Sequence, residues 1–220
     1  VALRAGSLQG APTYFAFASV GIILTVVLQS ATTGLARRIR EEQLTGTLEV
    51  LVMQPMTPVQ LALGLTGFPF LFGVLRGALY VVFAGTLLGL ELRGADLLGF
   101  VLVLAATAVA LSGIGVALGA VVLVFKQGEA LAVVLTFGFT LLSGSLFPRS
   151  LLPSWLGTVG DLLPTRFAID GLRDALFGGG GWHGDLVALV ITAVVLLPFS
   201  IWLFSLLLGV VKRAGSLSQY

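Results

Sequence analysis

The chain has 220 residues, of which 57% are hydrophobic and only 10% charged, and its formal net charge is +2. Soluble domains carry about a quarter charged residues. A water-soluble fold of this length could not bury so much apolar surface, so the surrounding solvent must be lipid. The absence of cysteine excludes disulfides and thiolate metal sites. Basic residues form local clusters rather than a stripe, which argues against a nucleic acid partner.

The N-terminal segment has no basic leader followed by an apolar core, so it is not a signal peptide. Since the chain begins with Val1 rather than Met, we interpret residues 1–12 as a loop that follows an absent upstream part. A further spanning helix is therefore expected before this chain.

Five stretches are long and apolar enough to cross a membrane, which requires ~20 mostly apolar residues. They cover about 14–36, 61–90, 97–125, 130–147 and 186–211. Pro69 and Pro198 predict bends in the second and fifth of these helices. The sequence thus predicts an all-α polytopic membrane protein with one transmembrane domain over residues 1–220.

The distribution of Lys and Arg predicts the orientation. Loops after the first, third and fifth spans share one side of the membrane, and dense basic clusters adjoin the helix ends there. These clusters are Arg37, Arg38, Arg40, Lys126, Lys212 and Arg213. Basic residues on the other side are largely accompanied by aspartates. We therefore expect the first side, with the C-terminus, to be cytoplasmic.

Residues 41–54 predict a short amphipathic helix just inside the membrane. Apolar residues recur there at helical spacing, acidic residues occupy the other faces, and Pro55 ends the helix. Helices that rest on lipid favour Lys and Arg on the polar face, and an anionic leaflet would repel carboxylates. Docking to a protein groove with basic walls is therefore favoured over resting on lipid.

Residues 148–181 contain two short helical patterns, neither long enough to span. Pro153 can begin the first, Pro164 ends it, and Thr165 can cap the second. Arg166 pairs with Asp170 at i,i+4 spacing, and Asp170 with Arg173 at i,i+3. Together they predict a hairpin that dips into the outer leaflet. The alternative is an amphipathic loop on the outer interface, anchored by Trp155 and Trp182.

Arg76 is the one charge deep in a predicted span, where insertion costs at least ~2.5 kcal/mol. It either lines a substrate path or snorkels and bonds a neighbouring carbonyl. Gln29, Ser30, Thr32 and Thr33 either line the same path or bridge helices. Gly113, Gly115 and Gly119 in the third span indicate close helix packing.

Residues 40–49 read Arg-Glu-Glu-Gln-Leu-Thr-Gly-Thr-Leu-Glu and precede Pro55. This segment resembles the coupling segment of the ABC-2 type permeases. Residues 143–148, 152–156 and 163–173 are similar to the stretch before the family's last span. The resemblance covers about 14–211 in the family's order. It implies six spans in the whole permease, five of them in this chain, in the bacterial inner membrane with a cytoplasmic C-terminus.

The resemblance also implies roles for particular residues. The expected ATPase-coupling residues are Glu41, Glu42, Leu44, Gly46, Thr47, Leu48, Glu49 and Leu51. The expected external gate consists of Phe147, Pro148, Pro153, Trp155, Pro164, Arg166, Asp170 and Arg173. Gln29, Thr33 and Arg76 are the candidates for the substrate path.

The sequence contains no Gly-x-x-x-x-Gly-Lys-Ser/Thr phosphate loop. We therefore expect ATP and magnesium on a separate ABC ATPase subunit, and no cofactor, metal or catalytic group on this chain. The lone His183 lies in a glycine-rich loop and is not expected to be catalytic. A second permease chain, identical or different, and membrane lipid are the other expected partners.

The expected function is ATP-driven export of a lipophilic, drug-like, lipid or polysaccharide substrate, as the resemblance implies. An ion-coupled transporter or channel is the main alternative, and it predicts carboxylates within the spans. Every Asp and Glu instead maps to a loop, a helix end or the hairpin. A membrane-embedded enzyme, the third class, would need an acid–base or metal cluster that the sequence does not supply.

Overall fold

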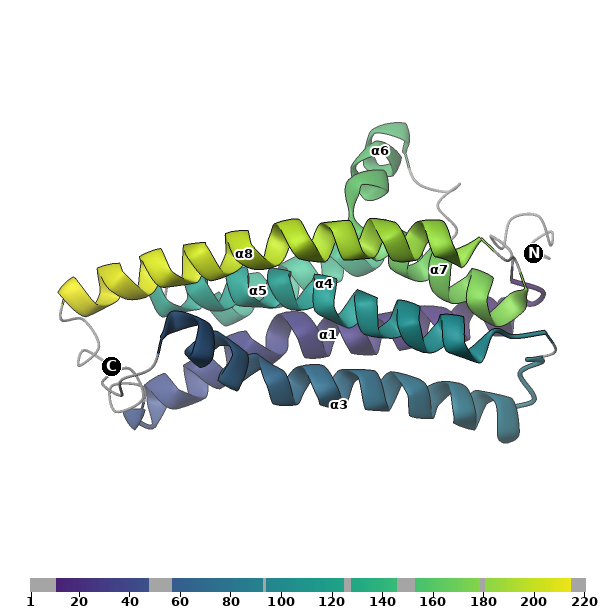
Figure 1. The fold of residues 1–220 in the computed structure, drawn as a ribbon, viewed down its shortest axis with the longest axis horizontal. Helices are drawn as coiled ribbons and strands as arrows, with labels where there is room; N and C mark the ends of the chain where they lie inside the picture. Colours follow the sequence, from purple (N-terminus) through teal and green to yellow (C-terminus); the bar gives the residue numbers. More distant parts are fainter. Residues whose placement is uncertain are drawn as a thin grey trace.

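The computed structural model of the chain describes residues 11–47, 57–92, 94–124, 128–145, 153–178 and 181–214, where all regular structure is α-helical. The long helices lie along one axis and form an elongated bundle, from which α6 projects (Figure 1). The helices are α1 (Tyr14–Leu44), α3 (Pro58–Thr86), α4 (Leu97–Val124), α5 (Gly128–Leu142), α6 (Ser154–Leu162), α7 (Pro164–Phe177) and α8 (Trp182–Ala214).

Three of the described helical segments are long and apolar enough to cross a membrane by length and composition. They are Tyr14–Glu42, Leu97–Leu123 and Trp182–Val211, and Phe70–Thr86 and Ala130–Leu142 are shorter apolar segments. The helical membrane character that the sequence predicted is therefore confirmed, whereas the number of spans stays a prediction. Only 17% of the most apolar window of α8 is buried, against 61% for α4, so α4 is the central helix of the bundle.

The fourth predicted span differs most from the structure. It was expected to reach residue 147, but α5 has 15 residues and ends at Leu142. At 1.5 Å per residue such a helix is about 22 Å long, short of the ~30 Å hydrocarbon core. Hydrogen bonds from Ser143 and Ser145 to the carbonyl of Thr140 accompany a turn in which Gly144 has a φ of 76°. This turn ends the helix inside the bundle.

Two other helix boundaries also follow from local chemistry. Thr57 and Gln60 form a capping box, so α3 begins at Pro58, earlier than the predicted residue 61. It ends at Thr86 rather than near residue 90, and Gly89, just beyond, has a φ of 68°. The fifth predicted span begins earlier than expected, at Trp182, and its helix is unbroken at Pro198.

Successive long helices run in opposite directions, as the predicted topology requires (Figure 1). The ends of α1, α4 and α8 lie at the end of the bundle on the left in Figure 1, which we call the basic end. The start of α4, the start of α8 and helix α7 lie toward the other end, the hairpin end.

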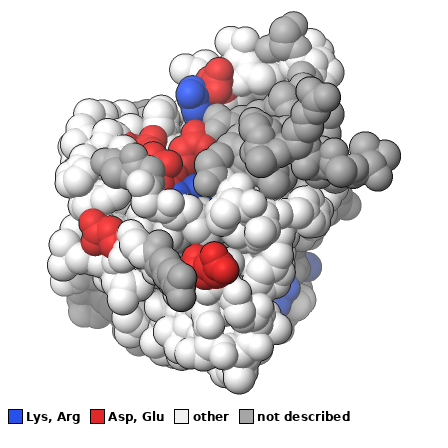
Figure 2. Space-filling view, turned by 90° about the vertical axis from the view of Figure 1, so that its right-hand side faces the viewer, with Lys and Arg blue, Asp and Glu red and all other residues white. Residues whose placement is uncertain are grey.

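Charge separates between the two ends among the described residues. Arg37, Arg38 and Arg40 lie near the end of α1, at the basic end. Acidic residues predominate at the hairpin end, which faces the viewer in Figure 2. The acids that lie on or between the elements there are Glu91, Asp96, Asp161, Asp170, Asp174 and Asp185. The predicted difference in charge between the two sides is thus present in the structure.

Glycines of α4 allow close packing of the neighbouring helices. A Cβ atom at Gly115 would overlap the carbonyl oxygen of Ala31 in α1. A Cβ at Gly113 would lie 3.0 Å from Cγ of Leu196 in α8. For these two glycines the packing interpretation is confirmed, because Gly115 lies against the backbone of α1 and Gly113 against a side chain of α8.

Replacing Gly115 with Ala should therefore lower the melting temperature of the purified protein in detergent. The new methyl group must push α1 away from α4, and overpacking of this kind costs about 1–3 kcal/mol. Gly138→Ala in α5 is the matched control, because no atom lies within 4 Å of a Cβ built there. Equal melting temperatures for the two variants would contradict the close approach.

Candidate functional site

The segment that resembles a coupling segment begins as the last turn of α1. A separate helix was expected to start near residue 41, but α1 is unbroken through Leu44 because neither Pro nor Gly occurs between Gly34 and Gly46. Gly46, with a φ of 72°, then turns the chain away from the helix axis. Glu41, Glu42, Leu44, Gly46 and Thr47 are described here, whereas Leu48, Glu49 and Leu51 lie outside the described residues.

Side chains of the same segment hold this turn together. Arg38 lies 3.2 Å from a carboxylate oxygen of Glu42 and 3.9 Å from one of Glu41. The Thr47 hydroxyl donates to the Glu42 carboxylate and lies 2.7 Å from the Thr45 hydroxyl. The acidic face was expected to suit a groove with basic walls, but Arg38 partly neutralises these two glutamates. Leu44 is 68% exposed and available to a partner surface.

The hairpin consists of α6 and α7, joined at Leu163. Leu163, not Thr165, is the N-cap residue of α7, and Pro164 is its first residue. The predicted cap at Thr165 is therefore wrong, since that side chain lies in the first turn and is buried. Pro153 caps α6, the exposed Trp155 lies on it, and Phe147 and Pro148 lie outside the described residues.

Arg166 connects the two helices of the hairpin. Its Nη1 lies 2.9 Å from the Asp161 carboxylate on α6, and its Nε lies 3.7 Å from the Asp170 carboxylate. The pair with Asp170 was predicted from the i,i+4 spacing. The shorter contact with Asp161 was not, because it depends on how the chain folds back at Leu163.

Helix α7 packs inside the bundle rather than resting on its surface. Ile169, Leu172 and Leu176 are fully buried and join the core cluster formed by α1, α4 and α8. Trp182, an anchor in the interface-loop alternative, is only 7% exposed, and its indole N–H donates to Asp96 at 3.1 Å. The alternative, a loop that lies on the outer interface, therefore does not describe α7. The structure also places His183, expected in a loop, in the first turn of α8, where its ring stacks on Trp182.

Arg173 is the most unusual residue of the hairpin, because it is 1% exposed. Its guanidinium lies 4.0 Å from the centre of the Phe17 ring in α1. Its Nη2 donates to the carbonyl oxygen of Gly144 at 3.2 Å. A cation over an aromatic face is stabilised most when water is excluded. Arg173 thus fastens α7 to α1 and to the turn after α5.

Sequence reasoning placed Arg173 on a charged face, paired along its own helix. Its i,i+3 spacing to Asp170 gave no sign of the contact with Phe17. The only available signal was an aromatic residue near the start of the first span, and aromatic residues are common there.

Asp174, in the last turns of α7, has a carboxyl group with a raised pKa. Partial burial, and secondarily the negative charge of Asp170, raise the pKa of its carboxyl above the ordinary value of 3.8. The ionised carboxylate is therefore less stable in the folded protein than in the unfolded chain.

All three candidates for the substrate path line one cavity. Gln29 and Thr33 of α1 and Arg76 of α3 surround a space of about 320 Å³. Ser30 of α1, which was expected either to line the path or to bridge helices, is also part of the lining. The remaining lining residues, which the sequence did not single out for this site, are Val26, Gly34, Arg37, Phe68 and Phe72. The spacing of the α1 residues, at intervals of three or four, places them on one face of that helix.

The polar residues of α1 were expected either to line the path or to bridge helices, and Thr32 does the second. Its hydroxyl lies 2.7 Å from the hydroxyl of Thr136 in α5, and both are buried. Thr32 therefore bridges helices, whereas Gln29 and Thr33 line the cavity.

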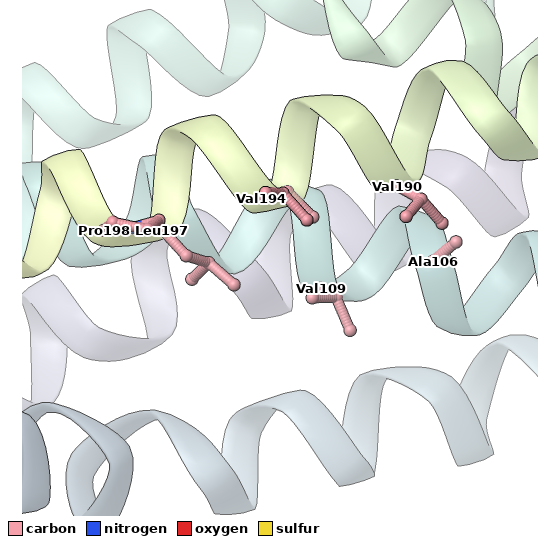
Figure 3. A pocket seen from close by; sticks show the side chains of 7 residues that line it. Ala106, Val109, Val190, Val194, Leu197 and Pro198 are labelled. Atoms are coloured by element: carbon pink, nitrogen blue, oxygen red, sulfur yellow. The ribbon is translucent and has the colours of Figure 1, made fainter.

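A second cavity, of about 440 Å³, lies between α4 and α8 (Figure 3). Its lining is entirely apolar, consisting of Ala106, Val109, Val190, Ala193, Val194, Leu197 and Pro198. It lacks the polar groups that orient a specific ligand.

The model of one family, described as ABC-2 type transporter, matches residues 2–177 of the chain. The match includes α1 to α7, and thus the coupling segment, the hairpin and the cavity lined by Gln29, Thr33 and Arg76. No curated protein matches the chain.

Replacing Phe17 with Leu should destabilise the protein by about 1–2 kcal/mol, because the buried guanidinium of Arg173 loses its aromatic face. Thermal unfolding in detergent would measure the loss. Phe15→Leu is the matched control, since Phe15 is on the same helix but 41% exposed. An equally small effect of both variants would show that the Phe17 contact contributes little.

Asp174→Asn should stabilise the protein at neutral pH. It should have no effect on stability at pH values below 3.8, the ordinary pKa of an aspartate carboxyl. A raised carboxyl pKa means that the folded state holds the proton more tightly, so the wild type loses stability as pH rises through that pKa. The asparagine variant does not titrate there. The measurement is the difference in melting temperature between variant and wild type, and a difference that shrinks as pH rises would contradict the assignment.

Proposed function

The chain belongs to the ABC-2 type transporter family, and we propose that it is the membrane-spanning permease of an ATP-driven exporter. A separate ATPase subunit, which binds ATP and magnesium, would dock at the turn after α1. Two permease chains, identical or different, would pair in the bacterial inner membrane, with the basic end in the cytoplasm. The cargo would be a lipophilic molecule such as a lipid, a drug-like compound or a lipid-linked polysaccharide.

The observation that carries this proposal is the continuity of α1. The helix has 31 residues and is therefore about 46 Å long. One end leads directly into the Thr45–Thr47 turn of the coupling segment. Near the other end, Phe17 contacts Arg173 of the hairpin. A continuous helix transmits displacement along its length, because every backbone hydrogen bond must be kept in a hydrocarbon environment.

A second contact strengthens the connection between α1 and the hairpin end. A Cβ atom at Gly21 would overlap the carbonyl oxygen of Ser145, in the turn that follows α5. The turn therefore lies directly against α1, and Arg173 donates to the neighbouring Gly144 carbonyl. A shift of α1 that follows ATP binding would disturb this site first. Opening of the hairpin is thus the proposed outward result of movement at the basic end.

The main alternative, coupling to protons or sodium, needs carboxylates along the spans. The described acids lie at helix ends, in the α3–α4 connection or on α6 and α7. Their positions suit ATP-driven transport better than an ion relay.

Gly46→Pro tests the docking of the ATPase. Proline requires a φ near −65°, whereas Gly46 has a φ of 72°, so the turn after α1 must rearrange. We expect ATPase co-purification to fall at least about tenfold, equivalent to ~1.4 kcal/mol of binding energy. Gly46→Asn should largely retain binding, because asparagine tolerates the left-handed conformation.

Gly94→Pro is the matched control, because Gly94 has a φ of 84° but lies in the connection between α3 and α4, at the hairpin end. Membrane insertion should be normal in all three variants. If Gly46→Pro keeps wild-type ATPase association and transport, or if Gly94→Pro loses them equally, the turn after α1 is not the docking site.

A further inference from the structure

The cavity between α1 and α3 lies at the middle of the bundle and extends toward its basic end. A Cβ atom at Gly73 would lie 2.9 Å from Cβ of Ser30, so these two residues mark the same level. Ser30 is close to the midpoint of α1, and Gly73 close to that of α3. From this level the lining extends along α1 to Arg37, about 10 Å nearer the basic end at 1.5 Å per residue.

The cavity combines cationic, hydrogen-bonding and aromatic groups. Arg37 and Arg76 are both part of the lining, and none of the nine lining residues is acidic. Gln29 adds an amide that can donate or accept hydrogen bonds. Phe68 and Phe72 supply an apolar wall, with their rings stacked at 5.9 Å. Arginines favour anionic oxygens, and phenyl rings favour hydrocarbon.

The positions of these groups suit a ligand with two parts, a polar headgroup and a hydrocarbon portion. Phe68 is 75% exposed and Phe72 is 49% exposed, so the aromatic wall continues from the cavity onto the outside of α3. The cavity volume of about 320 Å³ is small for a ligand site, enough for a headgroup but not for two long acyl chains. A headgroup inside and hydrocarbon over the exposed phenyl rings would fit both observations.

We propose that this cavity binds the anionic headgroup of an amphiphile taken from the leaflet at the basic end. Arg37 and Arg76 contact the anionic oxygens, Gln29 donates a hydrogen bond, and Phe68 and Phe72 cover the start of the chains. That the bound amphiphile is the exported cargo rests on the proposed function above. Binding itself requires no ATPase.

The competing explanation is that Arg76 has a purely structural role. Its guanidinium lies 5.9 Å from the centre of the Tyr80 ring, one turn along α3. This is near the outer limit for a cation–π contact, and Arg76 also lines the cavity. A structural arginine predicts no preference between anionic and zwitterionic ligands, so the two explanations can be separated by experiment.

The test measures binding of dioctanoyl phosphatidic acid to the purified chain in an uncharged detergent, without ATPase or nucleotide. Dioctanoyl phosphatidylcholine is the zwitterionic probe, and inorganic phosphate is the probe without chains. We expect phosphatidic acid to bind at least about tenfold more tightly than either. Arg76→Gln and Arg37→Gln should each weaken it about tenfold or more.

Arg38→Gln is the matched control, because Arg38 is on the same helix and exposed but pairs with Glu41 and Glu42 rather than lining the cavity. It should bind phosphatidic acid as the wild type does. If Arg76→Gln fails to fold, Arg37→Gln near the end of α1 tests the same claim.

Equal binding of phosphatidic acid and phosphatidylcholine would overturn the proposal, as would an equal loss in Arg38→Gln. Inorganic phosphate that binds as tightly as phosphatidic acid would show a site for a free anion rather than an amphiphile. None of these results would bear on the proposed docking of the ATPase, since Gly46→Pro tests that docking separately.

Discussion

A guanidinium buried in an apolar bundle needs partners for its charge and its N–H groups, and Arg173 contacts such partners on two other elements, although no hydrogen-bond partner for its buried Nε lies among the described residues. The Phe17 ring covers one face of the guanidinium, and the Gly144 carbonyl accepts from Nη2. Both partners belong to other elements. The position of α7 is therefore tied to α1 and to the end of α5, because a shift of either would leave a charge unsatisfied in the core.

The same constraint explains why α5 is short. Helix α5 ends at Leu142, and the turn that follows it lies against both α7 and α1. The turn at 143–145 places the Gly144 carbonyl within reach of Arg173 and the Ser145 carbonyl against Gly21. Since a carbonyl within a helix already accepts a backbone hydrogen bond, an interrupted helix provides the free acceptor that the arginine needs.

Local pattern in the sequence predicted much of the fold, because apolar length and period determine where a membrane helix can form. The pairing of Arg166 with Asp170 and the grouping of Gln29, Thr33 and Arg76 were predicted as well. The contacts that α7 makes with the rest of the bundle were not predicted. The burial of Arg173 has no signal within its own segment. The N-cap of α7 at Leu163 rather than Thr165 did have one, because proline favours the first position of a helix and Pro164 occupies it. The coupling segment was predicted to begin too early, since α1 continues through Leu44.

Helix α1 presents different faces to the two sites. Phe17, Gly21 and Thr32 face the hairpin, the turn after α5 and α5 itself. Gln29, Thr33 and Arg37 face the cavity beside α3. Since both faces belong to one unbroken helix, rotation or sliding of α1 would change the cavity and the hairpin together. Glycines at both faces, Gly21 against Ser145 and Gly73 against Ser30, bring the neighbouring backbones close, so even a small displacement of α1 must alter both contacts.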